Sequence, residues 1–186
     1  KIVSQPVKLP ELFDFYCQAI AGMAEAKNIR FSGKLHDISH NVLLSDQIRL
    51  GQIYMNLLSN AVKYTPENGD VKFEVYEEKL AESGKVRLVS VVSDTGIGMT
   101  PEFMEQMYSA FSRVNKVRGS GLGLDIVKKI VDLMDGEIEA ESKVGKGTTF
   151  RVTLDLPAAA DDAETEEHTE TAKHSPIIAL TANAYH

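Results

Sequence analysis

The stretch "DQIRLGQIYMNLLSNAVKYTP", residues 46–66, reads as one amphipathic helix with an unusual polar face. Its apolar side chains recur at three- and four-residue steps, which is the period of a helix surface. Asp46 is a suitable N-cap, and Thr65-Pro66 predicts that the helix ends near Tyr64. The apolar side is broad and comprises Leu50, Ile53, Tyr54, Leu57, Leu58 and Ala61.

The opposite side of the same helix is a narrow polar stripe made of Arg49, Gln52, Asn56, Asn60 and Lys63. One interpretation is a solvated face, but such faces are usually rich in Glu and Lys, because Asn is a poor helix former. The other interpretation is a ligand site. Amide oxygens suit a hard cation such as Mg²⁺, and a lysine can face a phosphate as a point charge. The helix alone leaves both interpretations open.

The remaining chain alternates helical and strand patterns irregularly, with tight turns between neighbouring strands. This order predicts a two-layer α/β sandwich with a mixed, largely antiparallel sheet, rather than a doubly wound parallel sheet. The expected helices span residues 10–27, 46–64, 101–108 and 123–134, and the expected strands span residues 28–35, 41–44, 71–78, 85–94, 137–142 and 148–156.

Composition excludes several classes of protein. The 186 residues are 43% hydrophobic, which suffices for a core, and no apolar run approaches the roughly 18 residues of a membrane span. The N-terminal residues do not look like a signal peptide. The single cysteine, Cys17, cannot form an internal disulfide, so a reducing cytoplasmic setting fits. We expect it to be a buried structural thiol rather than a nucleophile, and no CxxC or HExxH spacing indicates zinc.

The net charge of −7 is concentrated near the C-terminus. Residues 158–173 hold six acidic side chains and one lysine, so they carry −5, and the first 157 residues carry only −2. A body this close to neutral does not indicate a nucleic-acid surface. We expect residues 1–157 to form one domain, residues 158–173 to be an acidic linker, and residues 174–186 to be an apolar tail.

A glycine-rich turn, "GSGLGL" at residues 119–124, directly precedes the helix expected at 123–134. Glycines let a backbone approach a ligand closely, and a helix N-terminus offers free N–H groups to a phosphate. The spacing is neither that of a P-loop nor that of a dinucleotide fingerprint. By itself the turn is therefore more simply explained as a flexible connection.

A further motif is "SDTGIGMT" at residues 93–100, where an expected strand ends on a carboxylate. Asp94 follows an apolar run, and Gly96 and Gly98 allow a tight turn after it. The common role of such an aspartate is an N-cap or an Asx-turn. The alternative role is to accept a hydrogen bond from the exocyclic amine of a purine, in a pocket walled by Ile97 and Met99.

Taken together and in this order, the motifs strongly resemble the catalytic, ATP-binding domain of sensor histidine kinases. The N box is "NLLSNAVKYTP", the G1 box is "SDTGIGM", the F box is "MYSAFSRV" and the G2 box is "GSGLGL", followed by "GKGTTF". The resemblance covers roughly residues 1–157. It implies the Bergerat ATP-binding fold, in which three helices back a mixed sheet, and transfer of the γ-phosphoryl group of Mg-ATP to a histidine nitrogen.

The resemblance also implies roles for individual residues. Asn60 would ligate Mg²⁺ with Asn56 beside it, Lys63 would contact phosphate, Tyr64 would line the site, and Asp94 would accept the adenine amine. Thr148 or Thr149 would help through water, and Gly96 and Gly98 would make room for the base. The lid and phosphate turn would comprise Phe111, Arg113, Arg118, Gly119, Gly121, Leu122, Gly123 and Leu124.

The sequence departs from this family in three places. None of its five histidines has the "HE" or "HD" surroundings of the phosphoacceptor, so we expect the chain to be part of a longer, partly membrane-attached kinase. The implied partners are the dimerisation and histidine-phosphotransfer domain of that parent and a downstream response-regulator receiver. Only residues 115–118 separate the F and G2 boxes, which makes an unusually short lid. The tail "HSPIIALTANAY" resembles part of a receiver domain, with Thr181 as its switch hydroxyl.

Two competing functions remain to be weighed. The first is a nucleotide-binding module that no longer catalyses, and the presence of the complete set of Asn56, Asn60 and Lys63 argues against it. An ATPase that hydrolyses its nucleotide needs a base to activate water, and the N box has asparagine where those enzymes have glutamate. The sequence therefore favours a kinase domain.

Overall fold

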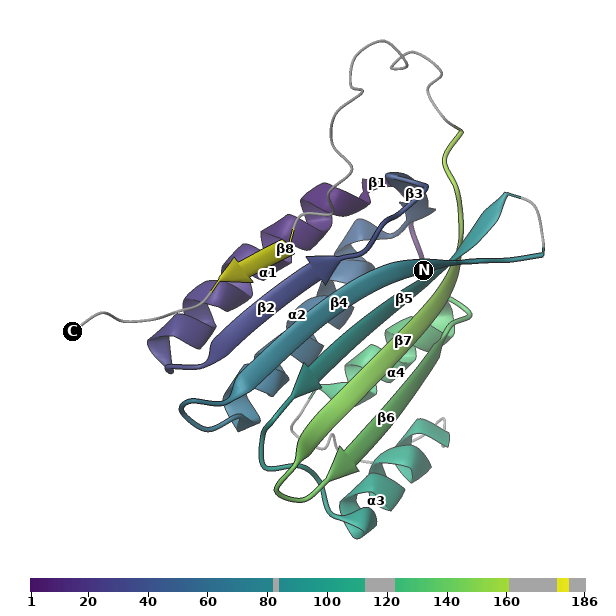
Figure 1. Cartoon of the computed structure of the whole chain (residues 1–186). Coiled ribbons are helices and arrows are strands. Elements are labelled where there is room, and N and C mark those ends of the chain that lie inside the picture. Colours follow the sequence, from purple (N-terminus) through teal and green to yellow (C-terminus); the bar gives the residue numbers. More distant parts are fainter. Residues whose placement is uncertain (82–83, 113–122, 161–176, 181–186) are drawn as a thin grey trace.

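The computed structural model describes residues 1–81, 84–112, 123–160 and 177–180, and side chains are described outside residues 108–112 and 177–180 (Figure 1). In chain order the elements are β1 (Gln5–Lys8), α1 (Leu9–Ala26), β2 (Arg30–Leu35), β3 (Val42–Ser45), α2 (Gln47–Tyr64), β4 (Asp70–Lys79), β5 (Lys85–Asp94), α3 (Pro101–Ser112), α4 (Leu124–Leu133), β6 (Glu137–Lys143), β7 (Gly147–Pro157) and β8 (Ile177–Leu180).

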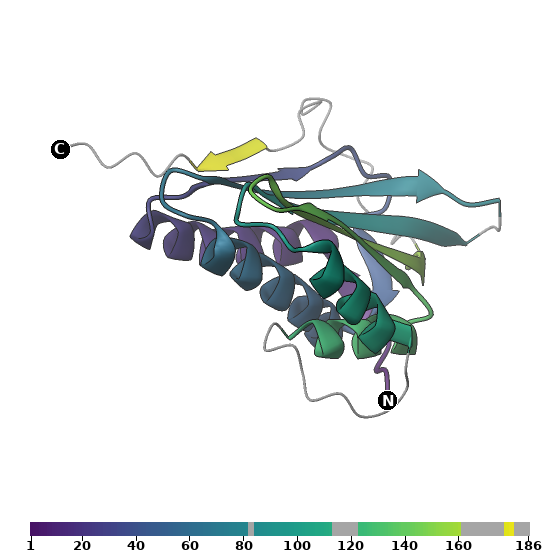
Figure 2. The same ribbon diagram turned by 90° about the horizontal axis from the view of Figure 1, so that it is seen from below.

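The main sheet has six strands in the order β6-β7-β5-β4-β2-β8. Strands β2 and β4 run parallel, and the other neighbours in this sheet are antiparallel. The helices lie together on one side of the sheet (Figure 2), with α1, α2 and α4 beneath the strands and α3 at the end near the β6–β7 turn. The predicted two-layer α/β sandwich with a mixed sheet is therefore confirmed.

The core lies between the two layers. Alternate residues of the central strands turn toward the helices and are buried, as Phe73 on β4 and Leu88 on β5 show. Phe73 stacks on Phe13 of α1 with ring centroids 5.0 Å apart, and it meets Tyr54 of α2 edge-on at 5.0 Å. The buried hydroxyl of Tyr54 shares a hydrogen bond of 2.8 Å with Ser90 Oγ, so its polar tip is satisfied.

Helix α2 begins and ends where the sequence predicts. The Asp46 side chain accepts a hydrogen bond from the Arg49 backbone N–H, as an N-cap should, and it also accepts one from Val3 N–H. Although burial opposes the effect, these backbone donors lower the pKa of the Asp46 carboxyl. Thr65, the C-cap, has an extended backbone and donates its hydroxyl to the Ala61 carbonyl at 2.6 Å.

Cys17 is fully buried between α1 and the sheet, as predicted for a structural thiol. Burial, together with the charge of Asp14, raises the pKa of the thiol to about 12. Because the thiolate is the reactive form, this shift disfavours reaction of Cys17 in the folded protein.

Two features of the fold differ from expectation or add to it. Strand β1 was not expected, and it pairs with β3 in a separate two-stranded antiparallel sheet. The body also extends past residue 157, because Ala158 and Ala159 donate backbone hydrogen bonds to Gly84 and Val42. Within the expected tail, Ile177–Leu180 forms β8 against the edge of β2. The acidic residues 161–173 lie outside the described residues.

Candidate functional site

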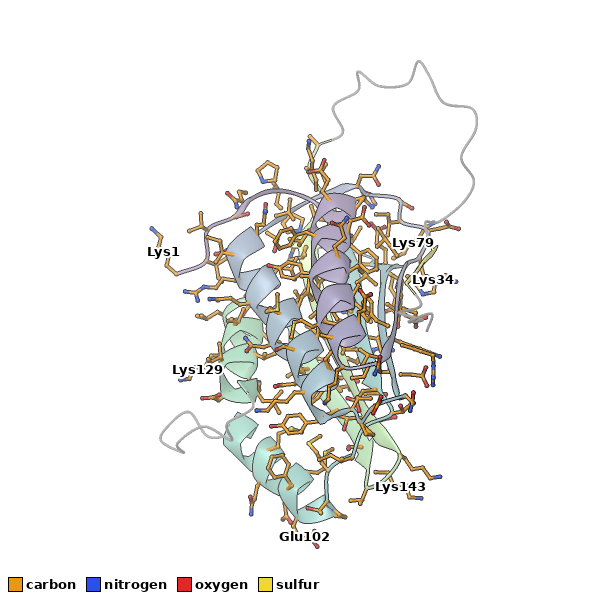
Figure 3. All side chains as sticks on the ribbon, turned by 90° about the vertical axis from the view of Figure 1, so that its left-hand side faces the viewer. Lys1, Lys34, Lys79, Glu102, Lys129 and Lys143 are labelled. Carbon is orange, nitrogen blue, oxygen red and sulfur yellow. The ribbon has the colours of Figure 1, made fainter. Side chains whose placement is uncertain are left out.

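A pocket opens at the end of the molecule where α2 and β5 finish and α3 and α4 begin. Its cavity volume is about 360 Å³. Figure 3 shows Glu102 of α3 and Lys143 at the end of β6 at this same end, beyond the last turn of α2. The pocket is lined by Asn60, Ala61, Tyr64, Asp94, Ile97, Gly98, Met99, Thr100, Phe103, Leu124, Thr148 and Phe150.

Asp94 supplies the carboxylate of the pocket. Its Oδ1 accepts hydrogen bonds from the backbone N–H of Gly96 at 2.8 Å and of Thr148 at 3.3 Å. Both bonds use the same oxygen, and no other described residue donates a hydrogen bond to Oδ2. Burial raises the pKa of this carboxyl above its usual 3.8, while the two backbone N–H groups act in the opposite direction. The carboxylate is thus held rigidly and is partly removed from water.

The glycines after Asp94 are required by the packing of the turn itself. A Cβ on Gly96 would lie 2.5 Å from the Tyr64 carbonyl oxygen. Gly98 has φ +70°, and a Cβ there would lie 2.1 Å from the Lys143 carbonyl oxygen. The turn after β5 therefore presses directly on the end of α2 and on the β6–β7 turn, a contact that the sequence could not show.

Apolar side chains form the walls of the pocket. Ile97 and Met99 line it as expected from the sequence, and Leu124 of α4 joins them. Ile97 is 59% exposed although it lines the pocket. Sequence reasoning missed four lining residues, Ala61, Thr100, Phe103 and Phe150. Periodicity gives pocket walls and core the same signal for the three on helices or strands, and Thr100 lies in the turn before α3, where no periodic pattern exists.

The polar stripe of α2 divides into two parts. Asn60 lines the pocket, whereas Asn56 lies one turn earlier and donates to the Gln52 carbonyl at 2.8 Å. Asn56 Oδ1 faces the start of α4, because a Cβ on Gly123 would come within 2.5 Å of it. Gly123 also has φ +66°, so both its backbone and its neighbour demand a glycine.

Lys63 and Thr149 do not line the pocket. The Lys63 ammonium lies over the ring of Tyr64, 5.2 Å from its centroid, and only the tyrosine contributes to the pocket wall. Thr149 donates to Ser93 Oγ at 3.2 Å, and the alternation of β7 places it on the sheet face opposite Thr148. Of the two threonines considered, Thr148 is therefore the one at the pocket.

Six predicted site residues are not described in full. Arg113, Arg118, Gly119, Gly121 and Leu122 lie outside the described residues, and Phe111 is described only as part of the α3 backbone. Among the residues that are described, no three His, Cys, Asp or Glu side chains gather as a metal site. Over the same residues, no helix combines the length and apolar character needed to cross a membrane.

Known proteins with similar sequences are sensor kinases. The chain is 34% identical over 166 residues to the sensor histidine kinase GacS of Pseudomonas protegens, which covers 87% of this chain and 18% of that protein. It is 43% identical over 117 residues to the autoinducer 2 sensor kinase/phosphatase LuxQ of Vibrio parahaemolyticus, which covers 60% and 14% respectively. The chain thus spans less than a fifth of these two relatives.

Solved structures give the same result. Full-length ShkA in complex with AMPPNP matches with a TM-score of 0.68 and 29% identity, over 86% of this chain and 32% of that one. The nucleotide-free catalytic domain of the histidine kinase ThkA matches with a TM-score of 0.63 and 25% identity, over 84% of this chain and 96% of that one. The chain therefore has the fold of a histidine kinase catalytic domain.

The motifs, the pocket and the relatives agree with a direct match to a family model. That model is described as histidine kinase-, DNA gyrase B- and HSP90-like ATPase, and it matches residues 45–158. This range contains α2, Asp94, α4 and Thr148, which are the elements that build the pocket. The chain belongs to the family of histidine kinase-, DNA gyrase B- and HSP90-like ATPases, on the branch whose members are sensor histidine kinases.

Proposed function

We propose that the pocket binds ATP with its adenine against Asp94, and that the domain donates the γ-phosphoryl group to a histidine on a separate dimerisation domain. The observation that carries this proposal is the Asp94 carboxylate, whose Oδ2 takes no hydrogen bond from another described residue, in a mostly apolar pocket. A purine amine needs an acceptor of this kind, and the flat ring needs apolar walls.

The walls suit a planar base. Met99 and Phe103 come from the turn after β5 and from α3, and Phe150 comes from β7, so the pocket is bounded by more than one element. Burying a base among these side chains supplies affinity through removal of apolar surface from water. The carboxylate then fixes the orientation of the base, because a purine turned over would leave Oδ2 without a partner.

The phosphates would lie toward Asn60 and the start of α4. The N-terminus of a helix offers unpaired backbone N–H groups, and α4 begins at Leu124, which lines the pocket. Asn56 Oδ1 lies close to Gly123, the residue just before this helix, and leaves no room for a side chain there. Lys63 and the residues between α3 and α4 are proposed as further phosphate contacts, as the family resemblance implies.

Asn60 fits a role in holding Mg²⁺. Mg²⁺ in nucleotide enzymes is bound through one or two protein oxygens together with phosphates and water, so a dedicated cluster of carboxylates is not needed. Asn60 lines the pocket, and its side chain carries an amide oxygen of the kind that Mg²⁺ accepts as a ligand. When bound, the ion would neutralise charge on the phosphate oxygens.

The chemistry assigned to this chain is positioning. In phosphoryl transfer a histidine nitrogen forms a bond to the γ-phosphorus, the bond to the bridging oxygen breaks, ADP leaves and the imidazole loses its proton. Little covalent work falls to the protein, so holding the donor in line with the acceptor accounts for most of the catalysis. The side chains of Asp94 and Asn60 would fix the two ends of the nucleotide.

The proposed partners follow from the same reaction. The acceptor would be the dimerisation and histidine-phosphotransfer domain of a parent kinase, and a response-regulator receiver would take the phosphoryl group from it. We also propose that the domain lies in the cytoplasm and that its parent protein is attached to the inner membrane. The tail, residues 174–186, is proposed to be a fragment of a receiver domain.

Phosphoryl transfer to a supplied dimerisation domain tests the proposal. With radiolabelled ATP and the dimerisation domain of a related kinase, the wild-type chain should label the acceptor. Asn60→Ala should reduce the labelling rate at least tenfold, because an amide oxygen in a nucleotide site contributes about 1.4 kcal/mol or more when its partner is charged. Unchanged labelling by Asn60→Ala would contradict the role given to Asn60.

A further inference from the structure

Three polar side chains lie side by side at the pocket end of the sheet, in one row across β6, β7 and β5. Ser142 is paired with Thr148, and Thr148 is paired with Asp94. The next row along the same strands, Ala140, Phe150 and Val92, is apolar and buried. The polar row therefore lies at the end of the sheet next to the core, and Ser142 on β6 is at one end of the row.

The Ser142 hydroxyl both accepts and donates a hydrogen bond. Its Oγ accepts from the Met99 backbone N–H at 2.8 Å and donates to the Gly147 carbonyl at 3.1 Å. It also lies 2.8 Å from Thr148 Oγ1. These contacts connect the turn after β5 to the β6–β7 turn, and the two turns are further joined by Gly145 N–H donating to the Ile97 carbonyl at 2.9 Å.

Either hydroxyl can be the donor in the bond between Ser142 and Thr148, and the direction depends on where the Ser142 proton goes. A serine hydroxyl has one proton and accepts through its oxygen. If that proton goes to the Gly147 carbonyl, the Thr148 hydroxyl must donate its own proton to Ser142. This arrangement satisfies the Met99 N–H, the Gly147 carbonyl and both hydroxyls. It leaves Thr148 Oγ1 with only lone pairs to offer to the pocket.

We propose that Ser142 is a positioning residue that makes the Thr148 hydroxyl an acceptor and thereby helps the pocket select adenine. This proposal rests on the proposed function, in which Asp94 meets the purine amine. Thr148 Oγ1 would then be a second acceptor near the same edge of the base, directly or through an ordered water. An amine at position 6 of the purine matches two acceptors, and a carbonyl at that position is repelled by them.

The prediction concerns the preference for ADP over inosine diphosphate, which carries a carbonyl where adenine carries the amine. Ser142→Ala frees the Thr148 hydroxyl to rotate and to donate to that carbonyl. The ratio of the two dissociation constants should therefore fall by roughly three- to tenfold, as expected for one hydrogen bond. Calorimetry on the full 186-residue chain with both nucleotides measures this ratio.

Further variants separate positioning from a general loss of structure. Ser142→Thr keeps a hydroxyl and should keep the preference. Thr148→Val should reduce the preference, and adding Ser142→Ala to Thr148→Val should reduce it no further, because Ser142 acts through Thr148. Thr153→Ala removes a hydroxyl from the same strand on the opposite sheet face and should leave the ratio unchanged.

The outcomes distinguish this inference from the proposed function. If Ser142→Ala weakens both nucleotides equally, or changes only the melting temperature, Ser142 is merely structural and the inference is wrong. If the wild type does not prefer ADP, or Asp94→Asn retains the full preference, base recognition by Asp94 is wrong instead. Loss of the preference in Asp94→Asn together with its retention in Ser142→Ala would refute the inference alone.

Discussion

Asp94 has the bond of one role that its sequence context allowed, and its position in the pocket is compatible with the other. Its Oδ1 accepts from Gly96 N–H two residues later, which is the bond of an Asx-turn, and Oδ2 remains for a ligand. A turn-forming aspartate and a ligand-binding aspartate leave the same pattern of Asp followed by glycines. The sequence alone therefore could not choose between them, and only the surrounding apolar pocket favours the ligand.

The pKa of Asp94 makes a prediction about stability. Burial raises the folded-state pKa above 3.8, so the folded protein binds this proton more tightly than the unfolded chain does. The resulting stability is fully present below the unfolded-state pKa and is lost as the pH rises through the folded-state pKa. Relative to Asp94→Asn, the wild type should lose stability over this acidic range, which urea titrations at several pH values would measure. A constant difference between the two proteins would contradict the burial of the charge.

Cys17 provides a second prediction at this scale. Because burial and Asp14 raise the pKa of its thiol to about 12, the native protein should not react with a thiol reagent at neutral pH. In urea the thiol should react fully, so the extent of labelling should follow unfolding measured by circular dichroism. Rapid labelling of the native protein would show that α1 does not cover the sheet as described.

At the scale of elements, the helices and the central strands were predictable because local signals agree with the fold. Asp46 and Thr65 bound α2 as expected, and the alternation of β4 and β5 identified a hairpin. Strand β1 was missed because it has four residues, contains Pro6, and pairs with residues 42–45, far along the chain. Long-range pairing of so short a segment leaves no periodic pattern to read.

The contact between α1 and β2 gives a prediction for a single element pair. A Cβ on Gly33 would lie 2.5 Å from Cys17 Sγ and 3.3 Å from Phe13 Cζ. Gly33→Ala should therefore reduce the free energy of unfolding by about 1–3 kcal/mol through overpacking. Gly22→Ala is the matched control, because nothing lies within 4 Å of its added Cβ. That control should stabilise the helix by about 0.5–1 kcal/mol, since alanine is the better helix former.

Residue type alone does not predict which side chains line the pocket. Asn60 and Asn56 share a helix face, yet only Asn60 lines the cavity, because the two lie a full turn apart and Asn56 reaches Gly123 instead. Phe103 and Phe150 line the cavity from α3 and β7, and in sequence they look like ordinary core residues. Which apolar residues border a cavity depends on how the layers meet, and that is a property of the assembled fold.

For the whole molecule, nucleotide binding and folding should be linked. A ligand that binds only the folded state raises the free energy of unfolding by about 2.7 kcal/mol when its concentration is 100 times its dissociation constant. Mg-ADP should therefore raise the melting temperature in a concentration-dependent way, and Asp94→Asn should lose most of this shift. A shift of equal size in both proteins would mean that the nucleotide does not use Asp94.

The central claim is that Asp94 recognises the adenine base, and calorimetric titration of ADP into the wild type and into Asp94→Asn tests it most directly. The substitution replaces one carboxylate oxygen by an amide N–H₂, so a purine amine would meet a donor where it had an acceptor. With Thr153→Ala as a control that should bind like the wild type, we predict that Asp94→Asn binds ADP at least tenfold more weakly. Equal dissociation constants for the wild type and Asp94→Asn would contradict the account.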